Sequence, residues 1–132
     1  MSFSDYWENA VLDHLFGKAV YSPPAHIYVG LSLADPLDDG SGLSEPTDAS
    51  YARVETDPAD WTASNGGVIE NATDITFPVP TGDWGTVTHG CLFDAASGGN
   101  LLACGSLLVP YEILAGPDAP VIAAAGIVVT GA

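Results

Sequence analysis

The strongest constraint on the fold is a change in the spacing of apolar residues at Pro23 and Pro24. Before these prolines, apolar side chains in residues 3–16 recur every three or four positions, which is the period of an amphipathic helix. After them, from residue 27 to residue 33, apolar residues alternate with polar or small ones, as on a half-buried strand. The sequence therefore predicts an amino-terminal helix over residues 3–16 and a β region over residues 26–129.

Both ends of the predicted helix carry residues that start and stop helices. Ser4 is placed to cap the first turn, and Gly17 is placed where a helix ends in left-handed backbone. Asp5 and Glu8 lie in the first turn, where negative charge stabilises the positive end of the helix dipole. These signals predict a single short helix that ends before Gly17.

Turn-forming residues divide the remaining chain into about seven short strands. The chain contains 15 Gly and 10 Pro, and only 14% of its residues are charged, against roughly 25% in a typical globular protein. Strands are expected at residues 26–33, 51–55, 68–77 (one or two strands), 86–94, 101–109 and 121–129. Residues 34–50 form a long surface loop. The predicted fold class is mainly β: a single-domain β-sandwich over residues 1–132, with the amino-terminal α-helix on one face or end.

The acidic charge excludes several kinds of partner. The formal net charge is −15, from 17 Asp and Glu against only Lys18 and Arg53. Two cations cannot neutralise the phosphates of DNA or RNA, nor bind an anionic membrane surface. The longest uncharged run, residues 119–132, is too short to cross about 30 Å of hydrocarbon as a helix. With no export signal visible at the start of the chain, we expect synthesis and assembly in the cytoplasm, without nucleic acid or membrane as partner.

The two cysteines lie in the clearest hairpin of the sequence, formed by residues 86–94 and 101–109. If Asp94 faces Leu101, the register places Cys91 opposite Cys104. In a protein made in the cytosol, the favoured interpretation is two buried thiols that act as small apolar side chains. A cross-strand disulfide is the alternative.

No catalytic motif is present, so neither an enzymatic activity nor a cofactor is expected. His89 and Asp94 point to opposite faces of a strand, which favours a structural role for His89. His14 falls on the apolar side of the helix and is expected to be packed or interfacial.

Asp35, Asp38 and Asp39 on a Gly-bearing loop are weak candidates for a calcium site, because Ca²⁺ prefers carboxylate ligands on such loops. Their spacing does not match an EF-hand loop. Asp also stabilises turns by accepting hydrogen bonds from nearby backbone amides, and a solvated turn is the favoured interpretation.

Aromatic residues beside acidic loops suggest a second binding chemistry, stacking on sugars. The residues in question are Trp61, Trp84, Tyr51 and Tyr111. In a domain of this size, tryptophans more often fill the core, and that interpretation is favoured here.

Two segments carry a resemblance to a known family. Residues 73–78 read Thr-Asp-Ile-Thr-Phe-Pro, and residues 83–102 read Asp-Trp-Gly-Thr-Val-Thr-His-Gly-Cys-Leu-Phe-Asp-Ala-Ala-Ser-Gly-Gly-Asn-Leu-Leu. Together they resemble small virion proteins of tailed bacteriophages, often labelled tail fibre or minor structural proteins. Weaker similarity extends to the helix and to residues 27–31, 34–36 and 51–53. The resemblance implies a virion component without enzymatic activity.

Three functions follow as hypotheses. The first is a capsid decoration, or cement, protein that forms a homotrimer over junctions of the major capsid protein and stabilises the head. The alternative is a tail fibre or baseplate component involved in host attachment, which would bind another tail protein. A second alternative is a carbohydrate- or calcium-binding module.

Three surfaces are expected to form interfaces, on the reasoning that they are exposed. The first is the helix face at Trp7 and Val11. The second is the loop from Asp35 to Asp48. The third is the last strand, from Ile127 to Val129.

Overall fold

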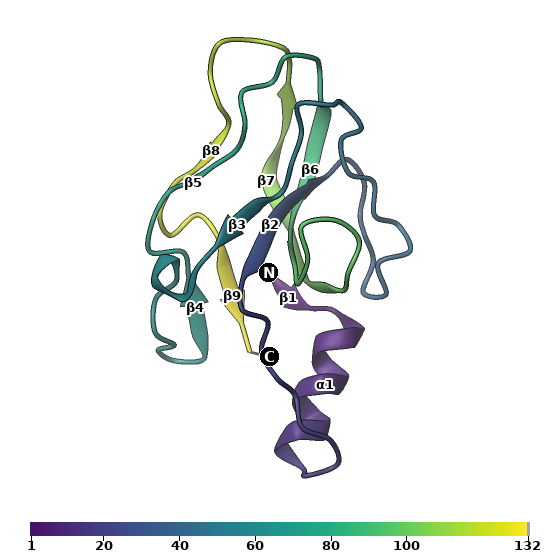
Figure 1. Cartoon of the computed structure of the whole chain (residues 1–132), viewed down its shortest axis with the longest axis vertical. Helices are drawn as coiled ribbons and strands as arrows, with labels where there is room; N and C mark the ends of the chain where they lie inside the picture. Colours follow the sequence, from purple (N-terminus) through teal and green to yellow (C-terminus); the bar gives the residue numbers. More distant parts are fainter. Residues whose placement is uncertain (132) are drawn as a thin grey trace.

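The computed structural model describes residues 1–131 and builds them around one five-stranded antiparallel sheet (Figure 1). In sheet order, its strands are β1 (Ser2–Phe3), β7 (Leu101–Ile113), β6 (Gly85–Phe93), β2 (Ile27–Ser32) and β3 (Val54–Thr56). Two short antiparallel pairs complete the β structure. These are β4 (Val68–Glu70) with β9 (Val128–Thr130), and β5 (Ile75–Thr76) with β8 (Val121–Ile122). The mainly β class with one amino-terminal α-helix is confirmed.

The core joins the main sheet to the short pairs. Val29, Val87 and Leu92 from β2 and β6 pack in one cluster with Phe77 and Ile127, which lie beside the short strands. Fully burying such a side chain contributes about 1.5–3 kcal/mol. The short pairs therefore form a second layer over the main sheet, in place of a second large sheet.

Ile127 and Val129, which were expected to form an exposed interface, point inward instead. Ile127 and Val129 are both buried in the core, and only Val128 between them is exposed. Strand alternation explains the result, because every second side chain of β9 faces the same layer. Ile127 and Val129 therefore do not offer an exposed interface.

Helix α1 (Asp5–Leu15) forms where the sequence predicts it. The side chain of Ser4 accepts a hydrogen bond from the backbone N–H of Trp7, and Gly17 has a φ of 72° just after the helix. Figure 1 shows α1 extending beyond one end of the sheet. None of its residues is buried. His14 is exposed, and its Nδ1 accepts a hydrogen bond from the backbone N–H of Tyr21 at 3.1 Å. His14 is therefore not packed in the core, and the other expectation, a place at an interface, stays a prediction.

The hairpin of β6 and β7 has the predicted pairing at its cysteines. Cys91 faces Cys104 with 4.3 Å between their Cα atoms, and the two side chains form a disulfide. The interpretation as two free thiols was therefore wrong, and the cross-strand alternative is correct. The predicted pairing of Asp94 with Leu101 is also wrong, because the register shifts after Leu92 and pairs Leu101 with Phe93.

Strand β7 contains a large bulge that the sequence did not reveal. Val87 of β6 faces Tyr111, while His89 faces Ser106. Residues 107–110 therefore lie opposite Thr88 alone, and we call them the β7 bulge. Leu108 in the bulge is fully exposed.

Beyond Cys104, the sheet order gives β7 one strand neighbour, β6, within the described residues.

Within residues 1–131, no helix is long and apolar enough to span a membrane.

Candidate functional site

Two hollows border the amino-terminal segment, and Phe3 lines both. We call the first, of about 440 Å³, the polar hollow, and the second, of about 620 Å³, the apolar groove. Together they contain several of the residues that the sequence singles out.

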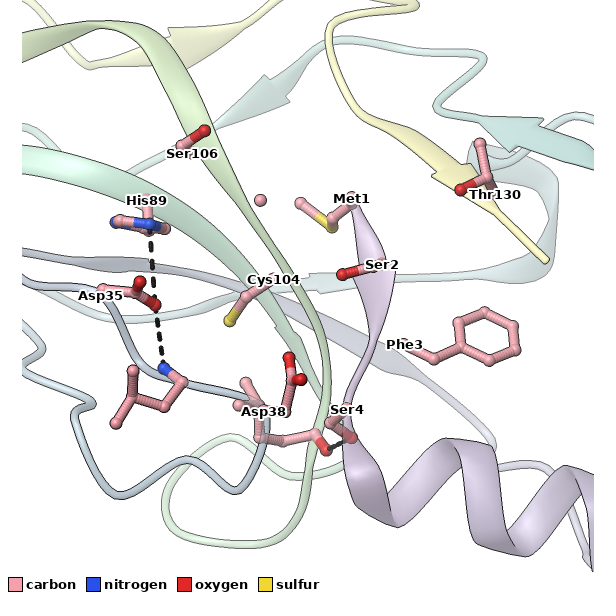
Figure 2. A pocket seen from close by; sticks show the side chains of 13 residues that line it. Met1, Ser2, Phe3, Ser4, Asp35, Asp38, His89, Cys104, Ser106 and Thr130 are labelled. Atoms are coloured by element: carbon pink, nitrogen blue, oxygen red, sulfur yellow. Dashed lines mark hydrogen bonds and ion pairs between the residues drawn. The ribbon is translucent and has the colours of Figure 1, made fainter. Parts of the chain in front are cut away.

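The polar hollow is lined by Asp35 and Asp38 of the long loop and by His89 of β6 (Figure 2). His89 and Asp35 point toward one another, with 3.9 Å between Nε2 and Oδ1. The other ring nitrogen of His89, Nδ1, shares a hydrogen bond of 2.8 Å with the hydroxyl of Thr88. Thr88 is not among the residues that line the hollow, so its hydroxyl is not presented there as a nucleophile. This geometry supports the structural role expected for His89.

Two of the three aspartates considered as weak candidates for a calcium site, Asp35 and Asp39, bond to the backbone of their own loop. The carboxylate of Asp35 accepts a hydrogen bond from the N–H of Leu37, and that of Asp39 accepts one from the N–H of Ser41, both at 2.9 Å. The bond from Ser41 lowers the pKa of Asp39. Within residues 1–131, no group of three or more Asp, Glu, His or Cys side chains is arranged to hold a metal ion. The geometry favours the turn interpretation.

The apolar groove brings together three of the residues expected at interfaces: Trp7 and Val11 of α1 and Val129 of β9. Trp61 lines the same groove. The indole N–H of Trp7 donates to the hydroxyl of Tyr21 and that of Trp61 donates to Oγ1 of Thr56, each at 2.9 Å. Because both polar edges are satisfied within the protein, the two rings contribute apolar surface to the groove.

The four aromatic residues considered for sugar stacking do not gather in one place. Trp84 is buried in the core, and Tyr51 packs edge-on against it with 5.2 Å between ring centroids. Tyr111 is exposed on β7. Only Trp61 of the four lines the apolar groove.

Asp48, the last residue of the proposed loop interface, fastens the loop to the core. Its carboxylate accepts hydrogen bonds from the backbone N–H and the hydroxyl of Ser50. The same hydroxyl accepts a bond of 2.9 Å from the indole N–H of Trp84. The bonds from Ser50 lower the pKa of Asp48.

The most densely bonded polar cluster does not stand out in the sequence; we call it the Arg53 clamp, and it consists of Glu45, Tyr51, Arg53 and Phe93. Nε and one terminal nitrogen of Arg53 donate to the two carboxylate oxygens of Glu45, each at 2.8 Å. The other terminal nitrogen donates to the backbone carbonyls of residues 95 and 98. The guanidinium lies 3.5 Å from the centre of the Phe93 ring.

The Arg53 clamp is buried and charged. The Arg53 side chain is 4% exposed. Burial opposes ionisation of Glu45, but the hydrogen bonds from Arg53 and Tyr51 outweigh burial and lower its pKa. Burial also raises the pKa of Tyr51, so its hydroxyl remains protonated and donates to Glu45. The one sequence signal for the clamp is that Arg53 is one of only two basic residues.

Comparison with known proteins identifies a family. A family model described as "Podophage GP4 fiber I protein gp80" matches residues 2–130. No curated protein matches the chain. The family match covers nearly the whole chain, including the Arg53 clamp and every residue that lines the two hollows except Met1 and Gly131.

Proposed function

Since the chain belongs to the podophage GP4 fiber I protein gp80 family and is thus a structural protein of a phage virion, we propose that it is a component of the tail fibre. The observation that carries the proposal is the family match over residues 2–130. The family description names a fibre, which favours the tail-fibre hypothesis over the capsid-decoration hypothesis.

The bonding of the loops supports a structural role. The Arg53 clamp ties the long loop of residues 34–50 to the hairpin loop of residues 95–100. The disulfide joins the two strands that lead into that hairpin loop. A fibre component must keep its shape while its surroundings move, and these links restrain the two loops against the sheet.

The partners that fit this role are other proteins of the tail. The homotrimer expected from the sequence was part of the capsid-decoration hypothesis, and the fibre proposal does not require it. The acidic surface keeps the chain from binding the packaged or ejected DNA.

Immunogold labelling of intact virions tests the proposal. Antibodies against the purified chain are expected to label the tail, and antibodies against the major capsid protein provide the control for the head. Quantitative mass spectrometry of the same virions should give a copy number close to that of other tail proteins. Labelling over the head, with a copy number close to that of the capsid protein, would overturn the fibre proposal in favour of decoration.

The apolar groove favours a second candidate function, contact with host sugars. The rings of Trp7 and Trp61 line this groove, and aromatic faces stack on the apolar faces of sugars. A glycan array should then show binding that Trp61→Ala removes and Tyr111→Ala, which alters an exposed aromatic outside the groove, preserves. An array on which the wild-type chain binds no glycan, or on which both variants bind equally, rejects this candidate.

A further inference from the structure

The outer face of α1 is an apolar surface that nothing in the described chain covers. Leu12, Leu15 and Phe16 are exposed, with Leu15 at 70% and Phe16 at 76%. Their spacing of three and four residues places them on one face of the helix. We define the outer face as these three residues together with Glu8, one turn before Leu12.

The adjoining face of α1, next to Leu15, already has its contacts. Trp7 and Val11 line the apolar groove, Trp7 bonds to Tyr21, and His14 accepts the N–H of Tyr21. The segment that follows the helix therefore occupies the inner side. The outer face remains in solvent, although a helix of 11 residues depends mainly on tertiary packing for its stability.

The charge pattern of α1 points to the occupant. Asp5 and Glu8 lie in its first turn, Asp13 and His14 lie in its last turn, and Lys18 comes three residues after its end at Leu15. Of the two basic side chains, Arg53 is buried in the clamp and Lys18 is exposed. Lys18 thus supplies an exposed cation two residues after Phe16, on a chain whose formal charge is −15.

We infer that a second copy of this chain binds here, through antiparallel pairing of the two outer faces of α1. In that arrangement, Leu12 and Phe16 of the two copies pack together, and Lys18 of each copy approaches Glu8 of the other. The two helix dipoles are then antiparallel, which is a favourable orientation. Contacts elsewhere would place acidic surface against acidic surface, which repels. This inference does not depend on the proposed function.

The size of the outer face predicts a weak contact. Stable interfaces bury about 800 Å² on each partner, more than a few side chains supply. Purified chain should therefore be a monomer when dilute and form dimers at roughly 0.1–1 mM. Within a virion, a high local concentration of copies would strengthen the same contact.

Sedimentation velocity over that concentration range tests the inference. The wild-type chain is expected to shift from monomer to dimer, Phe16→Asp to remain monomeric, and Leu108→Asp to behave as wild type. Leu108 is the matched control because it is an exposed leucine on the β7 bulge. Circular dichroism confirms that each variant is folded. A wild-type chain that stays monomeric, forms trimers, or forms dimers that Phe16→Asp leaves intact overturns the inference.

A charge exchange tests the antiparallel orientation. Lys18→Glu should weaken dimerisation several-fold at low salt, and adding Glu8→Lys to it should restore most of the loss, because the opposed charges are then exchanged. If Lys18→Glu has no effect, or the double variant is no better than the single one, the antiparallel arrangement is rejected. Both measurements use purified chain, so their outcome is separate from the location of the protein in the virion.

Discussion

At the scale of single residues, the Arg53 clamp shows how one rare cation organises an acidic chain. Arg53 satisfies both oxygens of Glu45 and two backbone carbonyls, and it covers the ring of Phe93. Bidentate Arg–carboxylate pairs are stronger and more directional than single ion pairs. The side chains of the clamp also leave no room for a Cβ atom at Gly30, which lies against them.

Gly30→Ala should destabilise the protein. A Cβ at Gly30 would lie 2.8 Å from the ring of Phe93, 3.0 Å from the hydroxyl of Tyr51 and 3.2 Å from Oε1 of Glu45. Overpacking of this kind costs about 1–3 kcal/mol in the free energy of unfolding, which urea denaturation measures. Gly116→Ala is the control, because the nearest atom to its added Cβ lies at 3.9 Å. Equal stability of the two variants would contradict the packing described for Gly30.

Glu45→Gln should reduce stability in a pH-dependent way. The folded pKa of Glu45 is lowered, so its stabilising effect is complete above its unfolded pKa of about 4.3 and is lost as the pH falls through the folded pKa. At pH 7, the variant leaves Arg53 without its carboxylate and should lose about 1–3 kcal/mol. The difference from wild type should shrink below about pH 4.

Urea denaturation at several pH values follows that difference. Asp118→Asn provides the control for removal of one exposed acidic charge. A difference between wild type and Glu45→Gln that does not change with pH would show that the ionised carboxylate is not the stabilising form.

At the scale of elements, the features that could be predicted are those set by residues close together in the sequence. The cap at Ser4, the end at Gly17 and the facing pair of cysteines were all predictable, because each follows from local spacing. Strand β1 was missed because two residues carry no period. The predicted strand over residues 121–129 is broken by a turn at Ala125, whose φ of 64° no apolar pattern reveals.

The candidate sites were less predictable than the helix and the hairpin, because they join segments that lie far apart in the sequence. The Arg53 clamp joins residues 45 and 53 to carbonyls at 95 and 98, and the apolar groove joins α1 to Trp61. Only the folded chain brings these segments together. The acidic residues at 35, 38 and 39 were visible in the sequence, but the hydrogen bonds that Asp35 and Asp39 accept from their own loop were not.

The disulfide between β6 and β7 should contribute measurably to stability. Its cysteines are separated by 13 positions. Closing a loop of about that length lowers the conformational entropy of the unfolded chain and thereby raises its free energy by about 3 kcal/mol. Cys91→Ala/Cys104→Ala should lower the free energy of unfolding by a similar amount. Reductant should destabilise the wild-type chain and leave the double variant unchanged. Wild-type protein that is insensitive to reductant would contradict this prediction.

At the scale of the whole molecule, repulsion among acidic side chains opposes folding. Only Arg53, in its ion pair with Glu45, and the exposed Lys18 offset the 17 acidic side chains, which leaves a formal net charge of −15. Salt screens exposed charges strongly and buried pairs weakly. The compact state should therefore gain more from reduced repulsion than it loses from a weakened Arg53 clamp.

Added KCl should accordingly raise the melting temperature, as scanning calorimetry between about 10 mM and 500 mM salt would show. Sucrose, which adds no charge, gives the control for general effects of a solute. A melting temperature that falls with KCl would contradict the prediction. A further rise in CaCl₂ at equal ionic strength would instead indicate specific calcium binding by the acidic loops.

The β7 bulge affects how the protein behaves when it is concentrated. Beyond Cys104, β7 has a strand on only one side within the described residues, and a regular edge there would be a template for pairing with further chains. The bulge interrupts the ladder, and Pro110 within it has no N–H to donate. The exposed edge therefore cannot seed a continuous intermolecular sheet along its length. Many newly made copies can thus accumulate before assembly without being drawn into amyloid-like deposits.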